Sequence, residues 1–431
     1  MRIKSRNAVP RLLALALLLL AVNLAGLAQP KPIKDLKPTV ILISLDGFRA
    51  DYLEKYDPPT LSRLAREGVR ARWMTPSFPS KTFPNHYAIA TGLYPQNNGI
   101  VENNIYDRER KVTFSMDNRP EVQNGHWWLG EPIWITAEKQ GQRAAPFFFP
   151  GSEAEIGGRR PTFWIPYDGK VLNTERVTTL LGWLDLPADQ RPTFLSLYFS
   201  DVDDAGHSFS PDSDKVKNAV LKVDHDLGRL IAELKAREVF EKVNLIIVSD
   251  HGMAAVDNHN AILLDKLFDT GLAEKILWTS EIVGIFPKEG KEAAIYDALK
   301  AGLPPHAKVY RKQDVPARYH YSNSPRIPPL LVLPDEGWVI TNSQRFAEME
   351  RRGAMSHLRG GHGYDNQLPS MRAIFIAHGE AIKQGKVVDA FENVQVYNVM
   401  CAILGLKPAP NDGNMEAAKA ILKETRSAGR W

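Results

Sequence analysis

The sequence predicts a doubly wound α/β fold with a mainly parallel central sheet and helices on both faces. Three short apolar runs, at residues 39–45, 193–200 and 245–249, are rich in β-branched or aromatic residues and show no polar alternation. Strands that are buried on both faces of a parallel sheet have this pattern. Helical patterns alternate with the strand patterns, as they do in βαβ units. A chain of 431 residues with 44% hydrophobic residues can bury such a sheet.

The first 28 residues have the pattern of a secretory signal peptide, with a basic start, an apolar run, and small residues at Gly26 and Ala28. The alternative is an uncleaved membrane anchor, because the apolar run is near the lower length limit for spanning a bilayer. In both cases we expect the rest of the chain outside the cytoplasm, in the periplasm or secreted. We expect a linker at residues 29–37, one main domain at 38–431 and no transmembrane segment in the mature chain.

The charges of the chain do not favour a nucleic-acid partner. The formal net charge is +4, but residues 1–28 contain four basic residues and no acidic one, which leaves 50 basic and 50 acidic residues. We therefore expect no stable nucleic-acid complex. The single cysteine, Cys401, excludes an internal disulfide framework and a thiolate metal cluster, and it lies in an apolar helical run as a core residue does. The sequence does not predict an oligomeric state.

Two helices have predictable boundaries. Between residues 214 and 239 the apolar side chains keep the 3.6-residue period of a one-sided stripe, so this helix should pack on the sheet. A second, short helix should begin near Thr82 and end before Gly92, with Pro84 in its first turn, where a missing N–H costs little.

From about residue 281 to 342 prolines are frequent and apolar runs are short, which predicts a small inserted α+β subdomain. The main sheet should resume at residues 372–377.

Each of the three apolar runs leads into residues that bind metals. Because the carboxyl ends of parallel strands meet at one edge of a sheet, we expect the side chains that follow these runs to converge there. Carboxylates and imidazoles together suit zinc, whereas oxygen ligands alone would suit magnesium or calcium. The alternative for an Asp at a strand end is a cap on the next helix, and the alternative for a His between glycines is a solvated loop. The candidate ligands are Asp46, Asp203, His207, Asp250, His251 and His362.

Thr82 is the candidate nucleophile. At a helix N-terminus its hydroxyl would face backbone donors and the positive end of the helix dipole, where an anion binds well. A free threonine hydroxyl is a poor nucleophile and needs activation by a metal or a base. Two divalent ions about 3.5–4 Å apart could lower the pKa of the hydroxyl and stabilise the leaving oxygen, an arrangement used for phosphoryl transfer. The alternative is that Thr82 only caps its helix.

At these residues the chain resembles the nucleotide pyrophosphatase/phosphodiesterase family, the type I phosphodiesterases of the alkaline phosphatase superfamily. The resemblance covers about residues 38–400 and implies an alkaline phosphatase-like catalytic domain. It also implies a hydrolase that cleaves nucleotide phosphodiester or pyrophosphate bonds and releases nucleoside 5′-monophosphates. The sequence shows no match to the additional cysteine-rich and nuclease-like domains of larger animal relatives. The chain therefore resembles a minimal bacterial-type member of the family. The matching segments are residues 45–49, 79–86, 99–104, 203–207, 249–253 and 361–363.

The resemblance implies two bound zinc ions, with Thr82 beside the second. One ion would be held by Asp203, His207 and His362, and the other by Asp46, Asp250 and His251. Where the family usually has proline before its metal-binding aspartate, this chain has Val202. Asp203 is preferred as the ligand because it precedes His207 by four residues, as in the family, and Asp201 is the alternative.

The resemblance also implies roles for residues outside the metal ligands. Thr82 would form a covalent nucleotidyl intermediate, which water then hydrolyses. Asn103 would donate a hydrogen bond to a non-bridging phosphoryl oxygen. Phe83 and Tyr167 match positions that sandwich the base in related enzymes, and stacking on aromatic rings suits this task because it tolerates any base. Their alternative role is core packing.

Other activities remain as alternatives. Related phosphate monoesterases carry a Lys-x-Arg pair for the third phosphate oxygen, whereas the comparable region here is residues 151–153, with Arg159 and Arg160 nearby. A lysophospholipid or choline phosphodiesterase of the same family is a second alternative, since that choice depends on pocket shape. A sulfatase is disfavoured because Thr82 does not begin a Cys/Ser-x-Pro-x-Arg motif. A metal-stabilised binding protein is disfavoured because a structural zinc site has no use for a nucleophile.

Overall fold

The computed structural model describes residues 30–353, 355 and 358–424. The signal peptide predicted at residues 1–28 lies outside the described residues. Among the helices of the described part, none has both the length and the apolar character needed to cross a bilayer.

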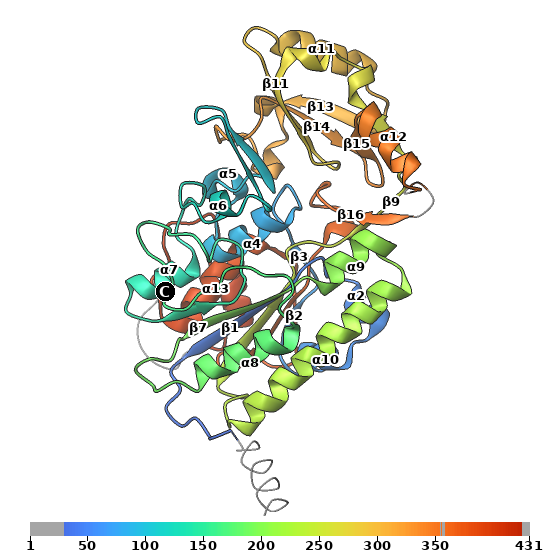
Figure 1. Cartoon of the computed structure of the whole chain (residues 1–431). Helices are drawn as coiled ribbons and strands as arrows, with labels where there is room; N and C mark the ends of the chain where they lie inside the picture. Colours follow the sequence, from blue (N-terminus) through green and yellow to red (C-terminus); the bar gives the residue numbers. More distant parts are fainter. Residues whose placement is uncertain (1–29, 354, 356–357, 425–431) are drawn as a thin grey trace, which may run out of the picture.

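A seven-stranded sheet forms the centre of the larger part of the molecule (Figure 1). Six of its strands run parallel to one another, and β17 runs antiparallel to both of its neighbours. This confirms the mainly parallel sheet predicted from the apolar runs. The strand order is β18 (Lys386–Val388), β2 (Val69–Ala71), β17 (Phe375–Gly379), β8 (Val243–Val248), β1 (Thr39–Leu45), β7 (Phe194–Phe199) and β6 (Ala144–Pro146).

Strand β1 shows why the apolar runs have no polar alternation. All seven of its residues are buried. Val40 and Leu42 belong to the hydrophobic core on one face of the sheet, whereas Ile41, Ile43 and Leu45 belong to the core on the other face. Since side chains alternate across a strand, a strand that is covered on both faces needs apolar residues at every position.

Helices cover both faces of this sheet, so the doubly wound arrangement is also confirmed (Figure 1). Each helix contributes its buried residues to one of the two cores. The core that contains Ile41 is covered by α2 (Tyr52–Tyr56), α3 (Pro59–Glu67), α8 (Asn173–Leu184) and α10 (Asp214–Ala236). The core that contains Val40 is covered by α4 (Thr82–Thr91), α7 (Ile133–Lys139), α13 (Val396–Leu404) and α14 (Glu416–Ile421).

The two helices with predicted boundaries form close to the expected positions. Helix α4 begins at Thr82, and its C-terminal cap is Gly92, whose φ of 68° suits a residue without a side chain. Helix α10 begins after Ser213, whose side chain accepts a hydrogen bond from the backbone N–H of Val216. It ends at Ala236, three residues before the predicted end, because the backbone turns at Glu238 with a φ of 57°.

A second sheet forms a smaller part of the molecule, in the upper part of Figure 1. Its strands are antiparallel and pack with helix α11 around a core of their own. Strand β11 and helix α12 lie outside the range 281–342 predicted for an inserted subdomain, and the division into domains stays a prediction. The elements are β11 (Ala273–Trp278), β12 (Val283–Pro287), β14 (Leu330–Pro334), β13 (Ala307–Arg311), α11 (Glu292–Gly302) and α12 (Ser343–Arg351).

Short paired strands and helices connect these parts. The paired strands are β3 (Met74–Thr75) with β19 (Phe391–Glu392), β4 (Asn104–Asp107) with β5 (Val112–Ser115), β9 (Ala254–Val256) with β16 (Arg359–Gly361), and β10 (Ala261–Leu263) with β15 (Val339–Thr341). The remaining α-helices are α5 (Pro95–Asn98), α6 (Arg119–Val122) and α9 (Asp201–Phe209).

Candidate active site

Three neighbouring strands bring the candidate ligands to one edge of the central sheet. Strand β1 lies between β7 and β8 and runs parallel to both, so the three carboxyl ends meet. Asp46 follows β1 directly, and helix α9, which carries Asp203 and His207, begins two residues after β7. Asp250 and His251 follow β8. His362 comes from outside this sheet, immediately after the short strand β16.

The first ligand group contains Asp203, His207 and His362. The Nε2 atoms of His207 and His362 are 3.1 Å apart. His207 Nε2 lies 3.4 Å from Asp203 Oδ2, and His362 Nε2 lies 3.7 Å from Asp203 Oδ1. Two nitrogens bound tetrahedrally to one zinc ion at about 2.0–2.1 Å would lie roughly 3.3–3.4 Å apart, so this spacing suits a shared metal.

The second ligand group contains Asp46, Asp250 and His251, all buried. His251 Nε2 lies 2.9 Å from Asp250 Oδ2 and 3.5 Å from Asp46 Oδ1. The remaining carboxylate oxygens are held by donors: Tyr198 donates to Asp46 Oδ2 at 2.6 Å, and the backbone N–H of Gly47 donates to Asp250 Oδ1 at 3.2 Å. One oxygen of each carboxylate is thereby left facing His251.

The three histidines are oriented in the same way. In each, the Nδ1 atom faces a backbone carbonyl oxygen. The partner of His207 is Gly360 at 3.1 Å, that of His251 is Gly252 at 2.8 Å, and that of His362 is Ser80 at 2.8 Å. A carbonyl oxygen can only accept a hydrogen bond, so each Nδ1 carries the proton and each Nε2 carries a lone pair. Metal-binding histidines commonly have their second nitrogen fixed in this way.

The buried carboxylates give an independent test of whether the site suits a cation. Within the described residues, Asp46 Oδ1, Asp203 Oδ1 and Asp250 Oδ2 are buried without a hydrogen-bond partner. Burial raises the pKa of Asp46 and of Asp250, and the neighbouring carboxylates raise the pKa of each further. Buried acceptor atoms that converge without donors are costly, and a bound cation would satisfy them. The residues of both groups therefore fit metal ions.

Thr82 lies beside the second group. Its Oγ1 atom is 3.3 Å from His251 Nε2. The N-terminal cap of α4 is Lys81, and no side-chain hydrogen bond caps this helix, so the Thr82 hydroxyl is not used as a cap. Thr82 is therefore the first residue of the helix and not its N-terminal cap.

The structure places Asp201 away from the first ligand group. Its Oδ2 accepts a hydrogen bond from Asn173 at 2.9 Å, and its Oδ1 pairs with Lys222. Asp203 instead lies with His207 and His362. Of the two neighbouring aspartates, only Asp203 has an oxygen directed at the histidines.

Asn103 and Phe83 lie at the start of α4, whereas Tyr167 contacts Phe148 and Tyr198, near the carboxyl end of β7. Asn103 Oδ1 accepts a hydrogen bond from the backbone N–H of Phe83 at 2.9 Å, which leaves its amide nitrogen as the group that can donate to a substrate. The ring of Phe83 packs against Phe114 and Trp128. Tyr167 is 39% exposed. One face of Phe83 is thus anchored in an aromatic cluster, whereas Tyr167 presents its ring to solvent.

Sequence reasoning assigned no role to His86, yet it lies directly beneath the site. This fully buried residue contacts the Thr82 carbonyl oxygen through Nδ1 at 2.8 Å and Ser44 Oγ through Nε2 at 2.8 Å. Its Nδ1 is also 3.4 Å from Asp250 Oδ2. Burial lowers the pKa of His86 to about 3, so the ring is neutral. The signal in the sequence was the four-residue spacing from Thr82, which places both residues on one helix face.

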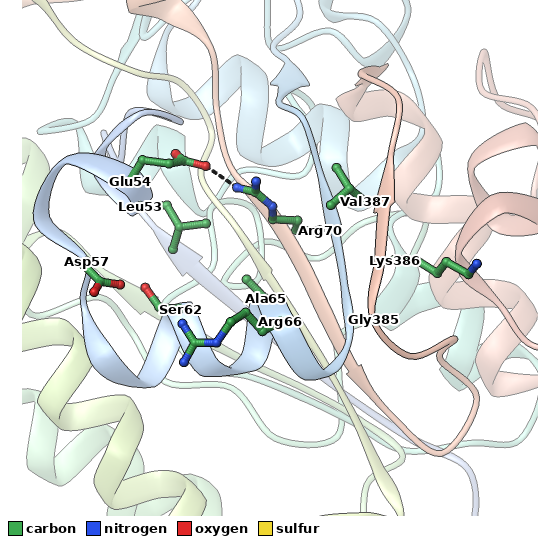
Figure 2. Close-up of a pocket in the computed structure, with 10 residues that line it drawn as sticks. All are labelled: Leu53, Glu54, Asp57, Ser62, Ala65, Arg66, Arg70, Gly385, Lys386 and Val387. Atoms are coloured by element: carbon green, nitrogen blue, oxygen red, sulfur yellow. Dashed lines mark hydrogen bonds and ion pairs between the residues drawn. The ribbon is translucent and has the colours of Figure 1, made fainter.

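The structure also contains a hollow of about 370 Å³ far from these residues, at the edge of the sheet next to β18 (Figure 2). It is lined by α2, α3, β2 and β18, and an ion pair between Glu54 and Arg70 lies in it (Figure 2). None of the candidate site residues lines this hollow.

The fold and the two groups of candidate ligands define an α/β protein with a threonine beside residues that suit metal ions, and comparisons with known proteins place it in a family. Residues 40–365 match the family model described as type I phosphodiesterase/nucleotide pyrophosphatase, and the chain belongs to this family. The resemblance predicted from the motifs is confirmed.

Relatives with curated sequences include venom phosphodiesterase CdcPDE of Crotalus durissus collilineatus, which is 39% identical over 393 residues, 89% of this chain and 46% of the relative. An uncharacterised pyrophosphatase/phosphodiesterase of Schizosaccharomyces pombe is 40% identical over 407 residues, 91% of this chain and 82% of the relative. The chain spans slightly less than half the length of the venom enzymes it matches.

Solved structures show the same fold. Murine ectonucleotide pyrophosphatase/phosphodiesterase 5 superposes with a TM-score of 0.83 at 34% identity, covering 89% of this chain and 100% of that chain. An inactive threonine-to-alanine variant of the murine protein, in complex with AMP, superposes with the same TM-score and identity. The alkaline phosphatase-like α/β fold that the motifs imply is therefore confirmed.

Proposed function

We propose that this protein is an exported two-zinc phosphodiesterase and pyrophosphatase that hydrolyses nucleotide phosphodiester or pyrophosphate bonds and releases nucleoside 5′-monophosphates. The observation that carries the proposal is the position of Thr82, whose hydroxyl oxygen lies 3.3 Å from His251 Nε2 at the meeting point of two mixed carboxylate and imidazole groups. Family membership and the AMP complex of a murine relative support a nucleotide substrate.

The metal sites follow from the donor atoms. Asp203, His207 and His362 would hold one zinc ion, and Asp46, Asp250 and His251 would hold the other. When bound, the two ions would supply Lewis acidity that lowers the pKa of the nucleophile and stabilises charge on the phosphoryl group and leaving oxygen. The mixture of carboxylate and imidazole ligands, with Nε2 as the imidazole donor, supports zinc over magnesium or calcium.

The residues of the chain account for the remaining chemistry. The Thr82 Oγ1 atom loses its proton and attacks phosphorus, a Thr82–phosphorus ester forms, the bond from phosphorus to the leaving oxygen breaks, and the leaving oxygen takes up a proton. Water then attacks the same phosphorus, the bond to Thr82 breaks, one proton of the water returns to Thr82 Oγ1, and a nucleoside 5′-monophosphate leaves. The amide nitrogen of Asn103 donates to a non-bridging oxygen, and the N-terminus of α4 favours the anionic phosphoryl group.

The substrate base would bind between Phe83 and Tyr167. The packing of Phe83 against Phe114 and Trp128 fixes its ring, and the exposure of Tyr167 leaves a ring face available. Stacking between two aromatic rings holds any base, which suits an enzyme that accepts different nucleotides.

In the monoesterase alternative, Arg159 or Arg160 would bind the third phosphate oxygen. Arg160 instead packs over Trp164 and donates to the backbone oxygen of Glu153, so Arg159 is the residue left for this alternative.

Hydrolysis of two matched chromogenic substrates tests this function. Zinc-loaded mature protein would be assayed with a nucleoside 5′-phosphodiester and with the corresponding aryl phosphate monoester under identical conditions. A diester rate that exceeds the monoester rate by orders of magnitude supports the proposal. A dominant monoester rate replaces it with a threonine-type phosphatase, and the same assay with a choline phosphodiester tests the lipid-derived alternative.

A further inference from the structure

Lys81, the residue directly before Thr82, forms an ion pair inside the protein. Its Nζ atom lies 2.7 Å from Glu281 Oε2, and the two side chains are only 8% and 5% exposed. Glu281 belongs to the segment between β11 and β12 of the small sheet. Although burial raises the pKa of Glu281, the nearby Lys81 and Arg359 cations lower it by more, so its carboxylate is charged. The pair therefore joins the small sheet to the start of the nucleophile helix.

A buried ion pair needs an explanation other than stability. Removing two charges from water costs about as much as, or more than, their attraction returns, so apolar replacements of both partners are often neutral or stabilising. Such pairs are retained in some proteins because they specify one arrangement of neighbouring elements. The elements next to this pair are those that carry Thr82 and His362.

The loop that carries His362 packs closely against the Lys81–Glu281 pair. A Cβ atom at Gly361 would lie 2.8 Å from Glu281 Oε1, and one at Gly363 would lie 2.4 Å from Lys81 Cε. Gly363 also has a φ of 120°, a backbone conformation that residues with a side chain rarely adopt. The glycines on both sides of His362 thus allow its backbone to approach the two charged side chains closely.

Hydrogen bonds tie the same loop to the residues before Thr82. His362 Nδ1 donates to the Ser80 carbonyl oxygen at 2.8 Å, and Ser80 Oγ donates to the carbonyl oxygen of Tyr364 at 3.1 Å. The Lys81 carbonyl oxygen accepts from the backbone and side-chain nitrogens of Asn85 at 3.1 and 2.8 Å. The segment that leads into Thr82 is consequently held on one side by the His362 loop and on the other by α4.

We propose that Lys81 and Glu281 are positioning residues, and that their ion pair sets the placement of Thr82 relative to His362. The small sheet, through Glu281, thereby contributes to the geometry of the active site without touching the reacting atoms. This inference rests on the proposed function, in which Thr82 attacks phosphorus and His362 holds one of the two zinc ions.

A double-mutant cycle on the full chain separates positioning from stability. The variants are Lys81→Met, Glu281→Met and the double variant, and Arg318→Met is the control. Arg318 pairs with Asp365, two residues beyond Gly363, but this pair is partly exposed. For each protein we would measure Tm, the rate of zinc transfer to a chelator, and kcat and KM for a nucleoside 5′-phosphodiester.

Each single variant should lose Tm, because Lys81→Met leaves the buried Glu281 carboxylate with only the longer contact to Arg359 at 3.6 Å, and Glu281→Met leaves the buried Lys81 without its carboxylate partner. In both variants kcat should fall about ten- to a hundredfold with a smaller change in KM. The double variant should regain Tm but not kcat, and zinc should leave all three variants faster than it leaves the Arg318→Met control. Recovery of kcat together with Tm in the double variant would overturn the inference, as would unchanged kcat and zinc release in Glu281→Met.

The measurements also separate this inference from the proposed function. A wild-type protein that binds zinc but does not cleave the diester would refute the function, while the zinc-release rates would still test the pair. If Lys81→Met does not fold, the comparison of Glu281→Met with the double variant gives the same decision, because both variants remove the contact of Glu281 with Arg359 and only Glu281→Met keeps the buried Lys81 without its partner.

Discussion

The Oγ1 atom of Thr82 lies 3.3 Å from the Nε2 atom of His251, and the ring of His251 is held by a hydrogen bond from its Nδ1 to the backbone oxygen of Gly252 at 2.8 Å. The first residue of a helix on one face of the sheet and a residue that follows strand β8 are thereby brought together.

Replacing Thr82 with alanine should abolish turnover while zinc content and folding are kept. The substitution removes the attacking oxygen but none of the six carboxylate and imidazole ligands, so the rate should fall by several orders of magnitude. Metal analysis, thermal unfolding and initial rates would check this, with Thr178→Ala on α8 as a control because that side chain is exposed and bonds only within its own helix. Retained activity would exclude covalent catalysis by Thr82.

The two neighbouring aspartates should differ in their effect on zinc binding. Asp203→Ala should reduce bound zinc, because Asp203 faces His207 and His362, whereas Asp201→Ala should leave zinc in place and lose only contacts with Asn173 and Lys222. Loss of a ligand or of its close partners typically weakens metal binding by at least about tenfold. Zinc titration of both variants measures the difference, and the opposite order would make Asp201 the ligand.

Tyr167→Ala should weaken the binding of substrates that carry a base. Stacking of a base on an aromatic ring is worth about 1–3 kcal/mol, so KM for a nucleoside 5′-phosphodiester should rise roughly 5- to 150-fold. The matched control is methyl 4-nitrophenyl phosphate, a diester without a base, whose KM should change little. An equal rise for both substrates would show that Tyr167 supports the site through packing against Phe148 and Tyr198 instead.

His378 should make the protein less stable in acid. It is buried on β17, stacks on Phe240 with ring centres 4.8 Å apart, and has a pKa below its ordinary 6.5 because burial disfavours its charged form. Below pH 6.5 the unfolded chain therefore binds a proton that the folded protein does not. The free energy of unfolding decreases as the pH falls from 6.5 towards the lowered pKa of the folded state.

His378→Phe should remove this contribution and keep the stack on Phe240. The Tm of the variant should exceed that of the wild type by more at pH 5 than at pH 7.5. His225→Phe, at an exposed position on α10, is the control for the loss of an exposed histidine. A His378→Phe variant with the same pH dependence as the wild type would show that other groups dominate the acid sensitivity.

Cys401 should react with thiol reagents only after the protein unfolds. The residue is buried in α13, and burial raises the pKa of its thiol to about 12, so the reactive thiolate is scarce at neutral pH. Because the chain contains one cysteine, a single alkylation event measured by mass spectrometry reports on this position. Rapid labelling of the native protein would show that α13 opens frequently.

The central sheet and the order of the site residues could be predicted because their signals are local. A strand such as β1, which is covered on both faces, favours apolar residues at nearly every position. The sequence therefore contains a continuous apolar run there. The strand ends then fix where Asp46 and Asp250 lie. The start of α4 at Thr82 was predictable for a similar reason, because Pro84 and Gly92 mark its two ends.

The tertiary structure alone decided which distant residues complete the site. His86 has no sequence feature except its spacing from Thr82, and its position beneath the site depends on Ser44 of a different element. The pairing of Lys81 with Glu281 joins residues 200 positions apart, and a charged residue in a sequence usually indicates an exposed surface. The sequence by itself determined the buried strands β1, β7, β8 and β17 and the residues that follow the first three of them, since these depend on neighbouring residues. The partners of each buried charge depend on packing between elements, and only the folded chain brings them together.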